Sequence, residues 1–333
     1  MTDGAASPRV RLEPMTWDDF DAWSERSVRG FAAQQTAAGL HTIPEATAYA
    51  EKAFADLLPA GLATPTHLFW TVHVGDAPTV GYLWLRVCPC SREPGECEAY
   101  VFDVEIVPEA RGPGLGRATM LAAEDAARDL GATVMRLNVF GHNTVAIRLY
   151  EGLGYVVTIS TLTKRLDPEY RPGDAGPLRL RDMTPDEYAV FRTSPEVGYE
   201  VRVARPGALS AAEAVRTATD DLDRLLPDGP ATGGHRLLWT ALDGEDPVGR
   251  LWVHLQRRSD GLHASGYEFH VREDRHGYER SIMRAAEHAC RELGVVSVGL
   301  SVPGFDSGAR ALCEHHGFGL TAQTMAKSLV RRE

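Results

Sequence analysis

The sequence predicts a mixed α/β (α+β) fold that is built as two similar domains in tandem. RLEPMT at residues 11–16 returns as RLRDMT at 179–184, and the same shift of 168 residues carries VGYLW onto VGRLW at 248–252. Several matches at one offset indicate a duplicated structural unit. Strand-like segments also follow one another before the first long glycine-entered helix, which favours a mixed sheet over a doubly wound parallel one.

The later part of the repeat and a linker set the domain boundary. Here the shift shortens to 163 residues and carries AAE, ending at Glu124, onto AAE, ending at Glu287. Between the two copies, residues 167–177 are rich in Pro and Gly and lack apolar periodicity, which is typical of a linker. We therefore expect a first domain over residues 1–170 and a second over residues 171–333.

Each domain is expected to begin with a short strand and then a helix. Thr16 and Thr184 are the predicted N-caps of these helices, because acidic residues follow each of them in the next turn. Apolar patterning, turn residues and a closing glycine then predict the remaining elements of the first domain. These are strands at 68–72, 81–87, 100–107, 133–139 and 155–166, and helices at 118–130 and 143–152.

Composition and charge limit the classes of function. Of 333 residues, 44% are hydrophobic and 24% are charged, as in ordinary globular domains. The net charge of −11 argues against general nucleic-acid binding, which needs a surplus of Lys and Arg. No segment has membrane-spanning length, and the first residues lack the pattern of a secretory signal. Five scattered cysteines fit a reducing compartment, so we expect a cytoplasmic protein without a membrane partner.

A glycine-rich loop between a strand and a helix is the first candidate site. It consists of Arg111, Gly112, Pro113, Gly114, Leu115, Gly116 and Arg117. Backbone N–H groups at a helix N-terminus bind anions, and small residues allow phosphates to approach closely. The loop is therefore predicted to hold phosphate groups, although glycine pairs also occur in ordinary strand-to-helix turns.

A second motif about thirty residues later adds the specificity that the loop lacks. The segment LNVFGHNTVAIRLYEGLGY at residues 137–155, taken with the Arg-x-x-Gly-x-Gly pattern of Arg111, Gly114 and Gly116, closely resembles the GNAT superfamily of acyl-CoA-dependent N-acyltransferases. The resemblance covers the first half well and the second half more faintly. In organisation the chain is similar to tandem members such as mycothiol synthase. The resemblance implies two GNAT-like domains, each with a mixed, mostly antiparallel sheet flanked by helices.

The resemblance also implies how the cofactor is held. The amides from Arg111 to Arg117 would bind the pyrophosphate of acetyl-CoA, and its pantetheine arm would add to the strand at residues 104–107. A backbone N–H at Ile106 or Val107 would polarise the thioester carbonyl. Asn143 matches the family position that contacts the cofactor. Tyr150 matches the acid that protonates the departing thiolate, with a buried core tyrosine as the alternative interpretation.

The base that deprotonates the amine is expected on the strand beside the thioester. Asp103 and Glu105 lie two residues apart, so they share one face of this strand. Either carboxylate could take the proton, directly or through water. Alternating charges along a strand are also typical of a solvated face, and that alternative stays open.

The second half departs from the motif at three positions. Gly116 is replaced by Glu279, whose carboxylate would repel pyrophosphate. The shift of 163 also places Asp306 opposite Asn143 and Cys313 opposite Tyr150. We therefore expect a degenerate copy that stabilises the first half, shapes the substrate cleft or binds another ligand.

A metal site is not expected. Cys88, Cys90 and Cys97 cluster in a predicted hairpin, but a fourth ligand and the spacing of structural zinc sites are missing. Reduced surface cysteines are the preferred interpretation. Trp70 and Trp84 recur at Trp239 and Trp252, as expected for repeated core or cleft packing.

The predicted function is direct transfer of an acetyl group from acetyl-CoA to a primary amine of a small molecule or peptide, catalysed by the first domain. The acceptor pocket is expected along residues 24–64, and the protein is expected to be a monomer or homodimer. One alternative is a non-catalytic acyl-CoA-binding sensor or scaffold. Another is a thiol-metabolite acetyltransferase similar to mycothiol synthase.

Overall fold

The chain folds into two compact units that do not follow the chain in order. The computed structural model describes residues 9–88, 97–112, 114–166, 178–193, 219–220, 222–232, 236–258, 260–272, 274–275 and 277–330. Unit 1 comprises Met1–Val157 together with Ala322–Glu333, and unit 2 comprises Thr158–Thr321. Both are mixed α/β units with a mostly antiparallel sheet flanked by helices, which confirms the predicted fold class.

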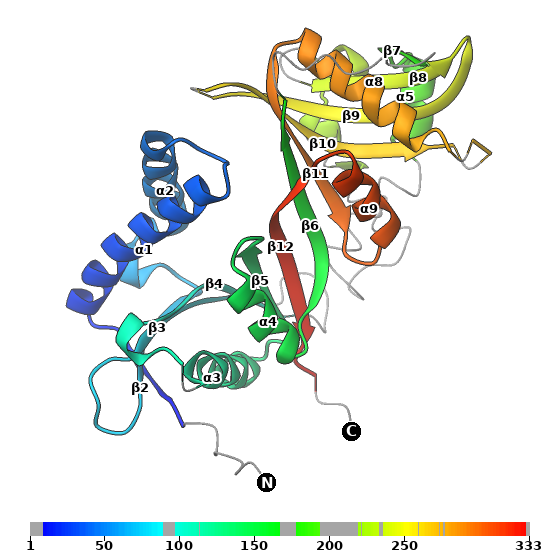
Figure 1. Ribbon diagram of the computed structural model, residues 1–333. Coiled ribbons are helices and arrows are strands. Elements are labelled where there is room, and N and C mark those ends of the chain that lie inside the picture. Colours follow the sequence, from blue (N-terminus) through cyan, green and yellow to red (C-terminus); the bar gives the residue numbers. More distant parts are fainter. Residues whose placement is uncertain are drawn as a thin grey trace. The chain divides into compact units, whose positions relative to one another are not determined.

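The strands and helices alternate in similar order in the two halves of the sequence (Figure 1). The strands are β1 (Arg11–Pro14), β2 (His67–His73), β3 (Gly81–Cys88), β4 (Glu98–Ile106), β5 (Val134–Phe140), β6 (Val156–Arg165), β7 (Leu178–Asp182), β8 (Arg236–Asp243), β9 (Asp246–Arg258), β10 (Gly261–Val271), β11 (Val295–Pro303) and β12 (Gly319–Ser328). The α-helices are α1 (Trp17–Ala37), α2 (Ile43–Leu57), α3 (Leu115–Asp129), α4 (Thr144–Gly152), α5 (Pro185–Phe191), α8 (Glu279–Glu292) and α9 (Ser307–His315).

Both predicted N-caps are present, and they begin the first helix of each half. The Thr16 hydroxyl accepts a hydrogen bond from the backbone N–H of Asp19, and the Asp19 side chain accepts from the backbone N–H of Thr16. Thr184 and Glu187 form the same capping box at the start of α5. This reciprocal arrangement satisfies amides that have no partner within the helix. Within the described part of the chain, none of the helices has both the length and the apolar character needed to span a bilayer.

The sheet of unit 1 has the strand order β1-β2-β3-β4-β5-β12. All neighbouring strands are antiparallel except β4 and β5, which are parallel. Helices α3 and α4 cover one face, where their apolar residues pack with Leu83, Val101 and Met135. Helices α1 and α2 cover the other face, where Trp23 and Trp84 are buried. The candidate residues of β4 therefore lie between two helical layers.

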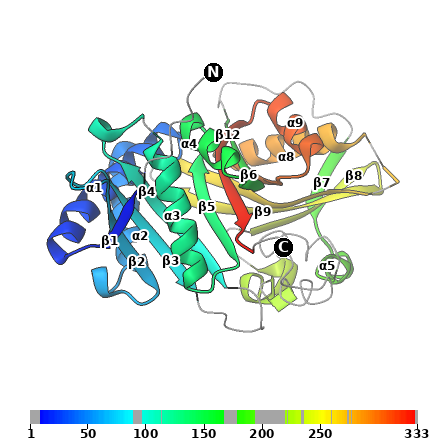
Figure 2. The same cartoon turned by 90° about the horizontal axis from the view of Figure 1, so that it is seen from below.

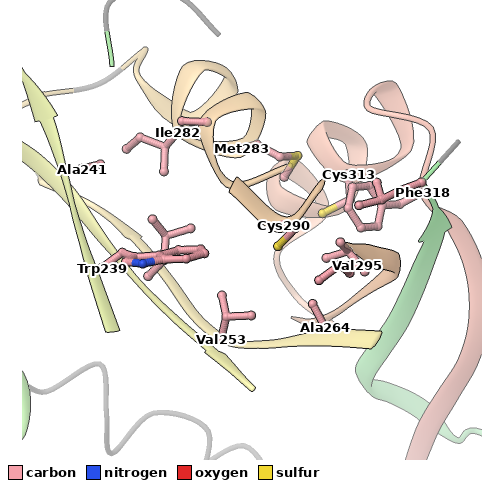
Figure 3. Packing of buried hydrophobic residues seen from close by; sticks show 14 of the residues in the cluster. Trp239, Ala241, Val253, Ala264, Ile282, Met283, Cys290, Val295, Cys313 and Phe318 are labelled. Carbon is pink, nitrogen blue, oxygen red and sulfur yellow. The ribbon is translucent and has the colours of Figure 1, made fainter. Parts of the chain in front are cut away.

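Unit 2 has the strand order β6-β11-β10-β9-β8-β7. Helices α8 and α9 pack on one face of this sheet (Figure 3). Ile282, Met283 and Cys290 of α8 and Cys313 of α9 point from the helices into the same apolar core as Trp239. Unit 2 thus keeps a complete core of its own.

Each sheet is completed by a strand from the other half of the sequence. In unit 1, β12 pairs antiparallel with β5, from Ala322↔Phe140 to Ser328↔Val134 (Figure 2). In unit 2, β6 pairs antiparallel with β11, from Ile159↔Pro303 to Arg165↔Ser297. The predicted division at residue 170 follows the repeat in the sequence, whereas the compact units follow the sheets.

Candidate active site

Strand β4 changes its pairing where the candidate residues begin. Trp84 of β3 pairs with Asp103, but the next residue, Leu85, pairs with Val101, so Phe102 is an extra residue in β4. Such a bulge bends the strand and strengthens its twist. On the opposite edge, the parallel pairing with β5 ends at Val101↔Leu137. Beyond Val101, β4 therefore leaves its β5-facing edge open.

The hydrogen bonds to β3 determine which amides face this open edge. The backbone N–H of Val107 donates to the Val80 carbonyl at 3.0 Å. Successive residues of a strand direct their backbone groups to opposite edges, so Val104 and Ile106 face away from β3. Of the two predicted oxyanion donors, Val107 is thus bonded within the sheet, and Ile106 faces the open edge.

The glycine-rich loop begins immediately after β4 and ends at the N-terminus of α3. Gly114 is the N-cap of α3, has a φ of 80° and offers no side chain to bond the first-turn amides of the helix. Gly112 also has a positive φ, 111°, a conformation that other residues rarely adopt. Pro113 lies outside the described residues. The amides of Leu115, Gly116 and Arg117 occupy the first turn, where the helix dipole favours an anion.

Three predicted cofactor residues have side chains or contacts that shape the loop and its surroundings. Arg111 donates from Nε to the Ile106 carbonyl at 3.0 Å, which folds it back onto the end of β4. Arg117 donates from Nη1 to the Gly152 carbonyl at 2.9 Å, which ties α3 to the end of α4. A Cβ at Gly116 would come within 3.3 Å of a Leu149 methyl group. The third glycine of the loop therefore serves helix packing.

Asn143 begins helix α4. Its Oδ1 accepts a hydrogen bond from the Ala146 N–H at 3.1 Å, and its backbone carbonyl accepts from the Ile147 N–H. These bonds account for an Asn at this position as an N-cap. Because Oδ1 is used by the cap, the predicted cofactor contact of Asn143 would have to be made by the amide nitrogen of its side chain.

Tyr150 lies in the core layer between the sheet and the helices of unit 1. It comes from α4 and is buried, and its ring lies edge-on to that of Tyr155 at 5.9 Å. Burial, together with the smaller effect of the nearby Asp103 carboxylate, raises the pKa of the Tyr150 phenol to about 12. The hydroxyl is therefore protonated throughout the neutral range, as an acid must be before it donates.

Asp103 is bound from the opposite side by helix α1. Both the Trp23 indole N–H, at 3.1 Å, and the Ser27 hydroxyl, at 2.6 Å, donate to its Oδ2. Neither of these two hydrogen bonds involves Oδ1. Burial raises the pKa of the Asp103 carboxyl and outweighs the two donors, which lower it. The two hydrogen bonds fix Oδ2 in position. The raised pKa makes the Asp103 carboxylate a better proton acceptor than an ordinary aspartate.

Glu105 has a different environment on the same strand. Its Oε2 accepts from Arg26 Nε at 3.0 Å, and the Arg26 guanidinium lies 4.2 Å over the ring of Tyr82. Tyr82 pairs directly with Glu105 across β3 and β4. The charge of Glu105 is thus compensated by an ion pair, whereas Asp103 is held by neutral donors.

Sequence reasoning missed the α1 residues that hold the two carboxylates. Trp23, Arg26 and Ser27 lie three and four positions apart, which places them on one face of a helix. That spacing was readable, but nothing in the sequence connected this face to a strand about eighty residues away. Arg26 and Ser27 do fall within the stretch where an acceptor pocket was expected.

The equivalent loop of unit 2 is closed by its own side chain. Gly277 donates its backbone N–H to Glu279 Oε2 at 2.8 Å, so a carboxylate occupies the start of α8. Asp306 caps α9 by accepting from the Ala309 N–H at 2.8 Å. Cys313 is buried, and burial raises the pKa of its thiol to about 11. This unit retains the fold around the loop and differs at each position expected to carry chemistry.

The cysteines need one correction. Cys97 is buried in the core of unit 1, so the expectation of a surface cysteine was wrong for this residue. It comes just before β4 and packs with Ala99 and Val101. The remainder of the hairpin at 89–96 lies outside the described residues. Among the described residues there is no cluster of three or more potential metal ligands.

Comparisons with known proteins agree with this geometry. A model of the acetyltransferase (GNAT) family matches residues 33–155. The chain is 33% identical over 155 residues to the uncharacterised N-acetyltransferase YdgE of Bacillus subtilis (strain 168), and the match covers 46% of this chain and 97% of YdgE. The chain therefore belongs to the acetyltransferase (GNAT) family and is an acyltransferase.

Two further likenesses concern the tandem organisation. The chain is 31% identical over 152 residues to the mycothiol acetyltransferase of Nocardiopsis dassonvillei, a match that covers 45% of this chain and 43% of that protein. The crystal structure of a GCN5-related N-acetyltransferase from Sphaerobacter thermophilus is similar along both halves, with a TM-score of 0.54 and 20% identity. That match covers 98% of this chain and 97% of the other, and it extends the shared fold to the second half.

Proposed function

We propose that unit 1 transfers an acetyl group from acetyl-CoA directly to a primary amine of a small molecule or peptide. The observation that carries the proposal is the open edge of β4, which leads at its end into the uncapped N-terminus of α3. An extended amide-containing arm can bond to such an edge, and an anionic group can bind the helix terminus. Together they fit a ligand that joins a pantetheine arm to a pyrophosphate.

The chain's own residues supply the proton transfers. Acetyl-CoA, when bound, supplies an activated acyl group, and the Ile106 N–H would stabilise negative charge that develops on the acyl oxygen. Asp103 Oδ1 takes a proton from the amine, directly or through water, as the N–C bond forms and the C–S bond breaks. Tyr150 gives its proton to the departing thiolate. Glu105 is the second candidate for the base.

Catalysis is assigned to unit 1 because unit 2 lacks the corresponding groups. Its loop amide is bonded to Glu279, and the position of Tyr150 is occupied by the buried Cys313. The phenol that is the proposed acid of unit 1 therefore has no counterpart at this position of unit 2.

The proposal is tested by following free CoA release from acetyl-CoA with purified protein across amines, amino acids, aminoglycosides and peptides. We expect acceptor-dependent release with wild type and much slower release with Tyr150→Phe. Acetyl-CoA binding without release in the presence of any acceptor would instead support a sensor or scaffold. Thioester hydrolysis without acetylation of an acceptor would also count against amine transfer.

A thiol-metabolite acetyltransferase is the second candidate. It is favoured by the match to mycothiol acetyltransferase, which spans less than half of that protein. The same screen separates the two candidates when it includes the amine precursors of such thiols, with the product identified by mass. Acetylation confined to those precursors would select the second candidate.

A further inference from the structure

A lysine near the end of the chain pairs with a buried carboxylate in the helix that begins at the glycine-rich loop. Lys327 of β12 places its Nζ 2.7 Å from Glu124 Oε1 and 2.6 Å from Oε2. Glu124 belongs to α3 and is fully buried. The pair joins β12, the strand that unit 1 receives from the second half of the sequence and that we call its exchanged strand, to α3. The N-terminus of α3 is the candidate pyrophosphate site.

Lys327, the partner of this carboxylate, is also linked to the proposed acid through aromatic contacts. Lys327 Nζ lies 5.6 Å from the centre of the Tyr155 ring, and that ring lies edge-on to Tyr150 at 5.9 Å. Arg128 adds a second cation to Glu124 at 3.2 Å, and its Nε donates to the Leu329 carbonyl after β12. Helix α3, Tyr155 and the end of β12 therefore meet around one buried charge.

A buried ion pair constrains position more strictly than an apolar contact does. A carboxylate removed from water needs its partners at hydrogen-bonding distance, so sliding or rotation of α3 against β12 separates charges in a medium that screens them poorly. At the other end of the buried pair's helix, Gly114 supplies no capping side chain, so the N-terminus of α3 lacks a cap that would fix its first amides.

The second unit contains a matched pair without an open loop. Lys164 of β6 places its Nζ 2.9 Å from Glu287 Oε1 and 2.7 Å from Oε2, and it lies 5.7 Å from the centre of the Phe318 ring. Glu287 belongs to α8, and Glu279 in the first turn of this helix bonds the Gly277 amide of the preceding loop. The two pairs share their geometry but differ in what lies at the helix N-terminus.

We propose that Lys327 is a positioning residue for the acetyl-CoA site: it fixes helix α3 and the Tyr155–Tyr150 pair through the buried carboxylate of Glu124. The inference rests on the proposed function of unit 1 and assigns part of its cofactor site to the opposite end of the sequence. Lys164 is assigned no such part, because its helix begins at a closed loop.

The test compares Lys327→Met with Lys164→Met. Each leaves one buried carboxylate without its lysine, so both should lower thermal stability. Only Lys327→Met should raise the Kd for acetyl-CoA, by roughly 3- to 30-fold, and increase hydrogen exchange at the first amides of α3. Lys164→Met should leave that Kd within about twofold of wild type. Equal effects of the two variants on the Kd would overturn the proposal.

A double variant keeps the test decisive if Lys327→Met does not fold. Lys327→Met with Glu124→Leu removes both charges and should recover stability. If the pair positions α3, the raised Kd and the faster exchange persist in the double variant. If the Kd and the exchange return to wild-type values together with stability, the positioning role is refuted. Should wild type not bind acetyl-CoA at all, the proposed function fails, and the exchange of α3 alone still decides whether Lys327 positions this helix.

Discussion

Two carboxylates on the same strand face are held in chemically different ways. Asp103 is bonded by the neutral donors Trp23 and Ser27 through one oxygen, and burial raises its pKa. Glu105 is held by the cation Arg26. A carboxylate with a raised pKa accepts a proton more readily than an ordinary one, so the local chemistry favours Asp103 as the base.

This difference predicts unequal effects of neutral isosteres. Asp103→Asn should lower kcat/KM by about 10²- to 10⁴-fold, the range of general-base contributions, and remove the acidic limb of the pH profile. In wild type that limb should have its midpoint above the ordinary pKa of Asp, because activity requires the deprotonated carboxylate and burial raises its pKa. Glu105→Gln should cause the smaller loss. The measurement is kcat/KM between about pH 5 and 9, and the reverse order of effects would assign the base to Glu105.

Tyr150 gives a second prediction at this scale. Tyr150→Phe should lower kcat by about 10²- to 10⁴-fold and leave the Kd for acetyl-CoA nearly unchanged, because it removes a proton donor from a buried ring that can still pack. Stopped-flow or steady-state kinetics with a binding titration separates the two quantities. Equal turnover would leave Tyr150 as a core residue only.

The pKa of Tyr150 also links it to stability at high pH. The folded pKa of about 12 exceeds the ordinary value of 10, so below pH 10 the phenol is protonated in both states and its contribution is fully present. Between pH 10 and about 12 the unfolded chain ionises first, and stability falls. The free energy of unfolding, measured by denaturant titration, should therefore fall less for Tyr150→Phe than for wild type between pH 10 and about 12. An equal fall in both proteins would show that burial does not raise the pKa of Tyr150.

At the scale of elements, the N-termini of α3 and α8 differ in whether a side chain places a carboxylate there. Both helices follow a glycine of positive φ, 80° at Gly114 and 100° at Gly277. At α8, Glu279 bonds the Gly277 amide, so the start of the helix already has its anion. At α3, Gly116 stands at the equivalent position and the first turn stays open.

This contrast predicts a separation of stability from ligand binding. Gly114→Ala and Gly277→Ala each force a side chain into the left-handed region, which should cost about 1–2 kcal/mol of unfolding free energy in both variants. Only Gly114→Ala should also weaken acetyl-CoA binding, because only its loop belongs to the proposed cofactor site. Calorimetric titration and thermal melts measure the two effects, and weaker binding in both variants would contradict the assignment of one site to unit 1.

Most elements could be predicted because the signals that determine them are local. The capping boxes at Thr16 and Thr184 and the glycine before α3 act within a few residues of themselves. The structure adds that Gly116 packs on α4 and that Asn143 caps α4. The bonds from α1 to Asp103 could not be predicted, because they join residues that are 76 and 80 positions apart.

At the scale of the whole molecule, the two halves of the sequence do not coincide with the two compact units, because each unit includes one strand from the other half. Met325 of β12 pairs with Leu137 and is fully buried in unit 1, although it belongs to the second half of the sequence. Leu162 of β6 pairs with Leu300 and is fully buried in unit 2. The repeat itself was readable, but each copy carries the same closing strand, so the sequence does not say which sheet that strand joins.

Core truncations on the exchanged strands test this organisation. Met325→Ala and Leu162→Ala should each cost about 2–5 kcal/mol of unfolding free energy. Hydrogen exchange followed by peptide should increase in β5 and α3 for Met325→Ala, and in β11 and α8 for Leu162→Ala. In each case the loosened peptides lie in the half of the sequence that does not contain the substitution. Faster exchange confined to the mutated half would contradict the strand exchange.

The exchange also bears on how the second half can diverge. The loop of the second half carries Glu279, and Cys313 stands at the position that matches the proposed acid, yet β12 has an apolar residue at Met325 and a cation at Lys327. Changes in that loop leave the pairing of β12 with β5 intact, whereas changes in β12 act directly on the sheet and core of unit 1.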